Sequence, residues 1–317
     1  MKIGLYTDSL GDRNFEEALD WAVSEGVETV EIGTGNFSPA PHCNLNELLD
    51  SKKARKQFLA AITERGLTLS ALNCNGNLLD PDPERRDGSQ AVFNKTVKVA
   101  GLLGIDTVVT MSGCPGDLQG GGYPNWVTCT WQREYVELLE RQWQEEISPF
   151  WKAAAKLARE NSVKIAIEMH PGQAVYNTRS LLRLRELCGA EVVGANLDPS
   201  HFFFQGMDPV VVVKALGKGG IFHVHAKDTR INPQEMALNG ALDTRPMLEP
   251  GIRSWEYVTL GYGHDESFWR NFISTLRMVD YNSTLSIEHE DMLISSEEGI
   301  RKSIRFLQQN ILRTAAQ

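Results

Sequence analysis

Four apolar runs in the sequence each lead to a side chain that can bind a metal ion. Residues 192–195 lead to Asp198, and three similar runs lead to Glu168, His225 and Glu288. An apolar run that stops at a polar side chain is typical of a buried strand that delivers this side chain at its C-terminal end. Carboxylate oxygens together with one imidazole suit a divalent cation such as Mn²⁺, Mg²⁺, Co²⁺ or Zn²⁺. The recurrence of such residues at one topological position therefore indicates a metal site.

The strands that carry these residues alternate with segments whose apolar spacing predicts helices. Between Asn14 and Glu25 the apolar residues fall on one helical face, Asn14 can cap the N-terminus and Gly26 can end the helix. The order of helix, glycine and strand recurs along the chain, with later helices expected from about Gln90 and across residues 133–160. The pattern predicts eight strands alternating with eight helices in an α/β protein.

Eight such units favour a (β/α)8 barrel formed by residues 1–317 as a single domain. An open, doubly wound sheet is the alternative architecture. The barrel is favoured because a closed barrel directs the C-terminal ends of all its strands into one pocket, whereas an open sheet would spread the polar strand ends apart. Two long loops, residues 112–132 and 232–265, are expected to flank this pocket. The first has the glycines and aromatic residues of a lid, and the second can serve the same mouth or an oligomer contact.

Composition and charge exclude several classes of partner. The net charge of −9 offers no basic surface for a nucleic acid. The five cysteines are scattered and form no CxxC pair, so neither a disulfide framework nor a thiolate zinc site is expected. No apolar stretch has the length of a signal peptide or a membrane span. We therefore expect a cytoplasmic protein that binds no membrane.

Motifs around the strand ends resemble those of the xylose-isomerase-like barrels. Residues 198–201 (Asp-Pro-Ser-His), 225–228 (His-Ala-Lys-Asp) and 288–291 (Glu-His-Glu-Asp) are similar to the metal-site motifs of this family. Residues 260–265 (Leu-Gly-Tyr-Gly-His-Asp) resemble the Gly-x-Gly loop before its last strand. The family includes sugar isomerases, keto-sugar 3-epimerases, inosose isomerases and dehydratases, and endonuclease IV. The resemblance covers essentially the whole chain and implies the same barrel.

The resemblance also implies roles for individual residues. One divalent metal ion, for which manganese is favoured, is expected to be held by Glu168, Asp198, His225 and Glu288. Glu168 and Glu288 are then the acid/base pair that exchanges a proton of the substrate through a metal-stabilised enediolate. Such a pair suits the chemistry because a proton beside a ketone is weakly acidic and needs both a base and stabilisation of the enolate oxygen. Substrate contacts are expected from His201, His170, Lys227, Arg230, Asn73 and Tyr6.

Neighbouring polar residues have simpler interpretations. His223 shares a strand face with His225 but lies one layer deeper, so a structural histidine is expected there. Asp228 is expected to orient Lys227 or a backbone turn rather than to bind metal.

These observations predict a metal-dependent sugar isomerase or epimerase whose partner is a small carbohydrate. A dehydratase or lyase acting on a keto-sugar, keto-glycoside or inosose is the alternative, because it shares the metal site and the first chemical step. A non-catalytic sugar-binding barrel is a further alternative. The zinc cluster of endonuclease IV needs histidines at the ends of the early strands, and the third and fourth expected strands lead instead to Asn73 and Thr110. We expect a homo-oligomer, to which a small partner subunit could be added.

Overall fold

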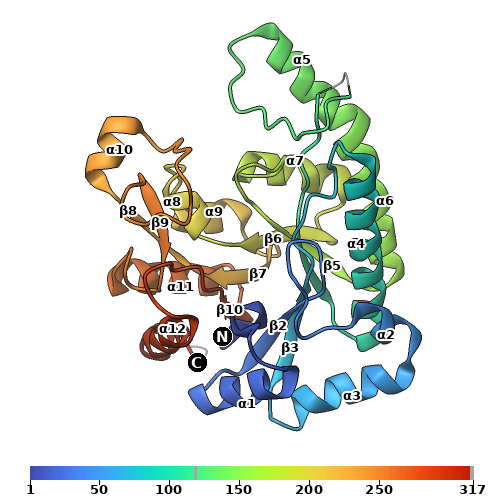
Figure 1. The fold of residues 1–317 in the computed structure, drawn as a ribbon, viewed down its shortest axis with the longest axis vertical. Coiled ribbons are helices and arrows are strands. Elements are labelled where there is room, and N and C mark those ends of the chain that lie inside the picture. The colour runs from blue at the N-terminus through green and yellow to red at the C-terminus, as the bar shows by residue number, and fades with distance from the viewer. Residues whose placement is uncertain (118–119, 315–317) are drawn as a thin grey trace. The chain divides into compact units, whose positions relative to one another are not determined.

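The computed structural model describes residues 1–117 and 120–314. Eight parallel strands form a closed barrel in the order β1, β10, β7, β6, β5, β4, β3, β2 (Figure 1). Their bounds are β1 (Lys2–Tyr6), β2 (Thr29–Gly33), β3 (Thr68–Asn73), β4 (Thr107–Met111), β5 (Lys164–Glu168), β6 (Val193–Leu197), β7 (Ile221–Ala226) and β10 (Thr284–Ile287). The predicted (β/α)8 architecture is confirmed, and the open sheet is excluded.

The helices follow the strands as the sequence pattern predicts, with several additions. They are α1 (Phe15–Glu25), α2 (Leu45–Asp50), α3 (Lys52–Thr63), α4 (Pro83–Leu103), α5 (Arg133–Arg141), α6 (Ser148–Glu160), α7 (Thr178–Cys188), α8 (Ser200–Phe203), α9 (Pro209–Leu216), α10 (Pro233–Asn239), α11 (Glu266–Met278) and α12 (Ser296–Asn310). A 3₁₀ turn, η1 (Thr7–Leu10), follows β1. None of the helices in the described part of the chain is both long and apolar enough to cross a membrane.

Local signals account for most of the helix ends. Asn14 caps α1 by accepting a hydrogen bond from the Glu17 amide, and Gly26 ends the helix in the left-handed conformation. The helix expected from Gln90 begins earlier, at Pro83, because Asp82 caps it and proline is well tolerated in the first turn.

Two segments differ from the prediction. The single helix expected at 133–160 is interrupted by a π-helical turn, η2 (Gln142–Ile147). Residues 232–265, expected as a loop, contain α10 and a strand, β9 (Trp255–Val258). This strand pairs antiparallel with β8 (Asp228–Ile231), which directly follows β7. The second long loop is therefore a structured insertion built on a two-stranded ribbon.

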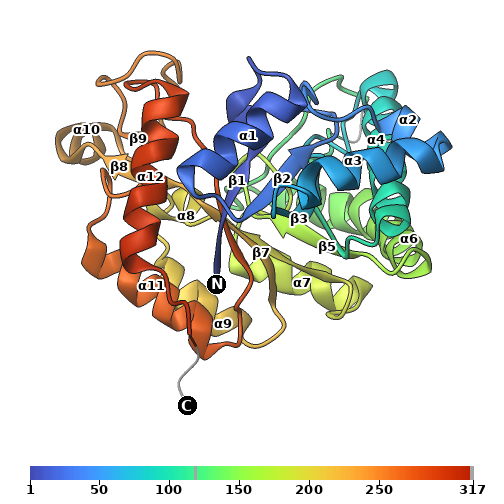
Figure 2. The ribbon, with the colours of Figure 1, turned by 90° about the horizontal axis from the view of Figure 1, so that it is seen from below.

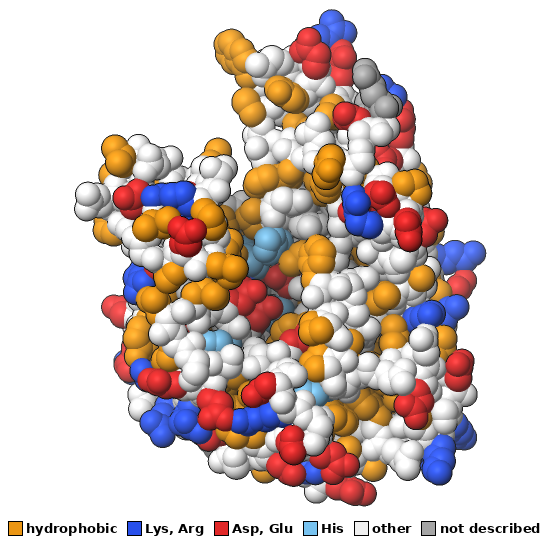
Figure 3. Space-filling view, in the orientation of Figure 1, with side chains coloured by type: hydrophobic (Ala, Val, Ile, Leu, Met, Phe, Trp, Pro, Cys, Tyr) orange, Lys and Arg blue, Asp and Glu red, His pale blue; other side chains and the backbone are white. Residues whose placement is uncertain are grey.

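Contacts between residues divide the chain into two compact units. The first comprises Met1–Glu31, Ala61–Ser70 and the chain from Leu197 onward, and the second comprises Ile32–Ala60 and Ala71–Asn196. In the first unit, α11 packs against both α9 and α12 (Figure 2). In the second, β4 pairs with β5 along its whole length, from Thr107 with Lys164 to Met111 with Glu168. Acidic and basic side chains are interspersed on the face drawn in Figure 3.

The Asp228 carboxylate holds the glycine loop 260–265 against the end of β7. Its Oδ2 accepts hydrogen bonds from the backbone amides of Gly261, Gly263 and His264, at 3.2, 3.2 and 2.9 Å. Its Oδ1 accepts from the Thr229 amide, and lies 2.8 Å from His264 Nδ1. A carboxylate that is fully buried requires such donors, so Asp228 orients a backbone turn, as expected from the sequence.

We expect Gly263→Ala to destabilise the protein by about 1–3 kcal/mol, because overpacking against a rigid backbone forces local shifts. A Cβ at this position would lie 2.3 Å from the Thr229 carbonyl oxygen. Gly88→Ala is the matched control, since Gly88 lies within α4 and a Cβ there would have no atom within 4 Å. That substitution should stabilise the helix by about 0.5–1 kcal/mol. Urea unfolding followed by circular dichroism measures both, and equal midpoints for the two variants would contradict the expectation.

Candidate metal centre

The first unit brings three of the predicted ligands together at the ends of β6, β7 and β10. Asp198, His225 and Glu288 each offer one ligand atom, and these atoms lie within 4.8 Å of one another. His225 Nδ1 and Glu288 Oε2 are 3.3 Å apart. The Asp198 carboxylate also accepts a hydrogen bond of 2.9 Å from the Ser200 amide, which fixes its orientation at the start of α8. Two carboxylates and an imidazole at this spacing fit a divalent cation.

Lys227 lies among the carboxylates of this group. Its ammonium nitrogen is 2.6 Å from Glu288 Oε2, 2.9 Å from Glu290 Oε2 and 3.2 Å from Asp198 Oδ2. Burial alone would lower the pKa of Lys227, but the three carboxylates raise this pKa well above its ordinary value. Lys227 is therefore a fixed positive charge and hydrogen-bond donor beside the candidate ligands.

The Glu31 carboxylate, from β2, forms a hydrogen bond with the His225 imidazole. His225 Nε2 lies 3.0 and 3.1 Å from the two Glu31 oxygens, so Nε2 carries the proton and Nδ1 faces Glu288. His223 Nε2 and Ser286 Oγ also hydrogen-bond to Glu31, at 2.9 and 2.7 Å. His223 is thus a buried, hydrogen-bonded histidine, in agreement with the structural role expected for it.

The charge on Glu31 is stabilised within this group. Burial alone would raise the pKa of the Glu31 carboxyl, but the imidazoles of His225 and His223 lower it well below its ordinary value. Glu31, His223 and His225 also lie close enough to form a metal group of their own. Their nitrogen–oxygen distances of 2.9–3.1 Å are those of direct hydrogen bonds, so the group is an orienting network.

His201 links Asp198 to the β8–β9 ribbon. Its Nε2 lies 3.2 Å from Asp198 Oδ2, and its Nδ1 shares a hydrogen bond of 2.9 Å with the Tyr257 hydroxyl. Tyr257 of β9 also places its ring 4.6 Å from the Lys227 ammonium. Burial, above all, raises the pKa of the Tyr257 phenol well above its ordinary value, so this hydroxyl stays protonated.

Tyr257 and Glu290 were not predicted from the sequence as site residues. Tyr257 lies in the segment expected to be a loop, although the alternation of Trp255, Glu256 and Tyr257 is a strand signal. Glu290 lies two residues beyond Glu288, a spacing that places two side chains on the same side of an extended segment.

The other predicted residues of the first unit have contacts of their own. The Tyr6 hydroxyl donates to Asp8 Oδ2 at 3.0 Å, and its ring stacks on that of His225 with centroids 6.2 Å apart. The Arg230 guanidinium is paired with Glu256 across the β8–β9 ribbon. The roles of both in substrate binding stay predictions.

In the second unit, Glu168 ends β5 and is 1% exposed. Its Oε2 accepts hydrogen bonds from the side-chain amides of Asn75 and Asn196, at 2.8 and 3.1 Å. The Asn73 side chain accepts from the Asn75 backbone amide at 2.9 Å, and thereby positions Asn75. His170 Nδ1 lies 2.6 Å from the Pro171 carbonyl oxygen, to which it donates. Two amide donors therefore fix the Glu168 carboxylate in one orientation.

Comparison with known proteins gives the family. The model of a family described as xylose isomerase-like TIM barrel matches residues 19–310. The chain belongs to this family. It is 43% identical over 314 residues to the uncharacterized protein YfiH of Bacillus subtilis (strain 168), a match that covers 98% of this chain and 99% of that protein. The family named by the resemblance is thereby confirmed.

Solved structures share the fold at low sequence identity. The IOLI protein, whose structure contains a zinc atom, has a TM-score of 0.66 at 19% identity, with 98% of each chain covered. The probable 3-DHS dehydratase AsbF from Bacillus anthracis has a TM-score of 0.67 at 15% identity, covering 97% of this chain and 99% of that one. A D-tagatose 3-epimerase-like protein has a TM-score of 0.64 at 17% identity, with 98% of each chain covered. These similarities show the barrel fold.

We expect Glu31→Gln to weaken Mn²⁺ binding by about 10- to 100-fold, because loss of a partner that orients a metal-binding histidine typically has this effect. Isothermal titration calorimetry on the metal-stripped protein measures the change in Kd. Glu28→Gln is the control, since Glu28 precedes β2 and its carboxylate accepts a hydrogen bond from the Ile3 amide, away from His225. Unchanged Mn²⁺ affinity in a folded Glu31→Gln variant would contradict the assignment of His225 as a ligand oriented by Glu31.

Proposed function

We propose that this protein is a divalent-metal-dependent sugar isomerase or epimerase that transfers a proton at the carbon beside a keto group. The observation that carries the proposal is the convergence of Asp198, His225 and Glu288 at strand ends, with the His225 imidazole oriented by Glu31. This donor set fits a divalent cation, with manganese as the proposed metal. When bound, such a cation would supply positive charge that favours the enolate form of the substrate.

We propose Glu168 as the fourth ligand and as one member of the acid/base pair. The support is topological: β5, β6, β7 and β10 are parallel strands of one closed barrel, and the strand C-termini of such a barrel face one mouth. Glu168 is also in register with Asn196 of β6, two residues before Asp198. The amides of Asn75 and Asn196 hold one Glu168 oxygen, so the carboxylate is preorganised for a defined task.

The chain's own residues then move the proton. One of the two carboxylates, Glu168 or Glu288, takes the proton from the carbon beside the ketone, and the other returns it. Return on the opposite face inverts the carbon, whereas return to the neighbouring carbon, together with transfer of the hydroxyl proton between the two enediolate oxygens, isomerises the sugar. The Lys227 ammonium donates to Glu288 and stabilises its ionised form, which is the form that can accept a proton. His201 and the Tyr257 hydroxyl supply polar groups next to Asp198 for substrate hydroxyls.

Two comparisons support this assignment and one supports an alternative. Among the structural neighbours, one is D-tagatose 3-epimerase-like, and another contains zinc. A third is a probable dehydratase. A dehydratase or lyase acting on a keto-sugar, keto-glycoside or inosose therefore stands as the second candidate. It would use the same proton abstraction and then expel a group from the neighbouring carbon.

Proton NMR in D2O tests the proposal. We expect the Mn²⁺-loaded protein to introduce deuterium beside the carbonyl of at least one compound in a panel of ketoses, inososes and 3-keto-glycosides. Treatment with EDTA should abolish this exchange, and re-addition of Mn²⁺ should restore it. The accompanying product distinguishes an epimer or isomer from an eliminated, unsaturated sugar.

Substitution of Glu168 and Glu288 tests their proposed role as the acid/base pair in the same exchange measurement. Glu168→Gln and Glu288→Gln should each slow the exchange by about 10²- to 10⁴-fold, the usual contribution of a general acid or base. Glu298→Gln is the control, because Glu298 lies on α12 and its carboxylate pairs with Lys302. Full exchange by both active-site variants would refute the assignment of the acid/base pair.

A further inference from the structure

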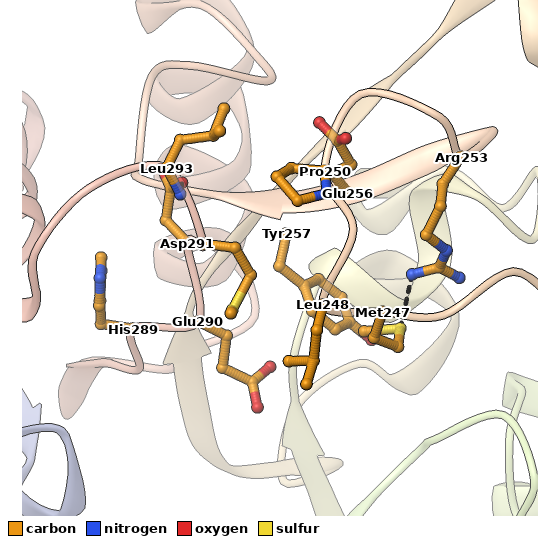
Figure 4. A pocket seen from close by; sticks show the side chains of 11 residues that line it. Met247, Leu248, Pro250, Arg253, Glu256, Tyr257, His289, Glu290, Asp291 and Leu293 are labelled. Carbon is orange, nitrogen blue, oxygen red and sulfur yellow. Dashed lines mark hydrogen bonds between the residues drawn. The ribbon is translucent and has the colours of Figure 1, made fainter.

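The first unit contains a pocket of about 400 Å³ beside the candidate metal centre. Two segments form its walls: residues 247–257 of the insertion, and residues 289–293 after β10 (Figure 4). Its side chains include Met247, Leu248, Tyr257, Glu290 and Leu293. Figure 4 shows the Glu290 carboxylate and the Leu248 side chain extending into the same region below the Tyr257 ring. A volume of this size is in the range of small-molecule sites.

Two residues of the pocket wall contact residues of the candidate metal centre. Glu290 lines the pocket, and its Oε2 is 2.9 Å from the Lys227 ammonium, which lies 2.6 Å from Glu288 Oε2. Tyr257, which also lines the pocket, bonds to His201 beside Asp198. Glu290 and Tyr257 therefore belong both to the pocket wall and to the surroundings of the candidate metal centre.

The acidic side chains around the pocket already have partners within the protein, and the buried guanidinium of Arg253 stacks 4.3 Å from the Trp255 ring. Glu290 is paired with Lys227, and Glu256 with Arg230. Asp291 accepts hydrogen bonds from the amide and hydroxyl of Thr259, at 2.8 and 2.9 Å. Glu290 and Glu256 are thus paired with cations, and the Asp291 carboxylate is held by neutral donors, so none of the three is free of partners within the protein.

What remains for a ligand is an apolar wall. Leu248 is 73% exposed, Leu293 61% and Met247 47%, although all three are large hydrophobic residues lining a concavity. Exposed apolar side chains gathered in a pocket mark a binding site, because their burial by a ligand is favourable. Methionine adapts to aromatic rings through its polarisable sulfur, and Met247 lines the pocket together with the aromatic residue Tyr257.

We propose that this pocket binds an aromatic group attached to the sugar, so that the substrate is a keto-sugar carrying an aromatic substituent rather than a free ketose. The inference rests on the proposed function, whose site the pocket adjoins. The sugar ring occupies the candidate metal centre, and the substituent reaches past Lys227 to lie between Leu248, Leu293 and Tyr257. The pocket thereby selects for the part of the substrate that does not react.

The test compares the methyl and phenyl glycosides of the same 3-keto-hexose with the Mn²⁺-loaded protein. Deuterium exchange gives KM for each, and the phenyl glycoside should have the lower KM by at least about tenfold, since even one methylene in a hydrophobic pocket changes selectivity by this order. Leu248→Ser and Leu293→Ser should bring the ratio of the two KM values close to one. Leu238→Ser is the matched control, since Leu238 is 75% exposed in the same insertion and does not line the pocket. It should keep the ratio of the parent protein.

The outcomes separate this inference from the proposed function. Exchange with equal KM values for the two glycosides would overturn the inference and leave the proposed function standing. Absence of exchange from both would count against the proposed function, and saturation-transfer NMR would then test the pocket alone. If the phenyl glycoside binds more tightly than the methyl glycoside and Leu248→Ser removes this difference, the inference is supported. Equal binding of the two glycosides to the parent protein would overturn it. If Leu248→Ser instead dissociates an oligomer in sedimentation velocity and keeps the KM ratio, the pocket is a subunit contact and the inference is wrong.

Discussion

The buried carboxylate of Glu31 is the group on which the geometry of the candidate metal centre depends. An ionised carboxylate without exposure to water costs several kcal/mol unless hydrogen bonds and opposite charge compensate it. Here the compensation comes from His223 and His225 of β7 and from Ser286 of β10. The need to satisfy one charge thus fixes three strands in register and leaves the His225 imidazole with a single orientation. The candidate centre is built on that orientation.

Above this network the balance of charge favours a cation. Asp198, Glu288 and Glu290 contribute three carboxylates around the single ammonium of Lys227, which leaves two negative charges. A divalent cation would neutralise this excess, and Asp198 is held without the flexibility of an exposed side chain, since it is 1% exposed. Lys227 prevents the carboxylates from repelling one another strongly, so the group can stay assembled while substrate enters or leaves.

The sequence predicted the barrel and the strand-end acids because both depend on local patterns. Buried parallel strands read as apolar runs, and Asp198, His225 and Glu288 stand where such runs stop. The contact of Glu31 with two histidines could not be predicted, because β2 and β7 are far apart in the sequence and are brought to one barrel interior only by its closure. Tyr257 was not predicted because β8 and β9 are separated by more than twenty residues, too many for a short hairpin turn to mark their pairing. The π-helical turn at Gln142–Ile147 was not predicted either, since residues 133–160 read as one continuous helix.

Under the proposed function, the strand ends supply the chemistry and the insertion of residues 232–265 supplies the selectivity. The candidate ligands of the first unit belong to strand ends that any barrel of this topology presents, and these ends are constrained by the pairing of their neighbours. In the insertion, Tyr257 is fixed by the pairing of β9 with β8 and bonds to His201, whereas Leu248 of the apolar wall lies outside any strand. The Asp228 carboxylate fixes the C-terminal end of the insertion, because it accepts hydrogen bonds from the backbone amides of the glycine loop. Because Asp228 fixes where the insertion returns to the barrel, residues between 232 and 255 can vary in conformation without displacing the candidate ligands.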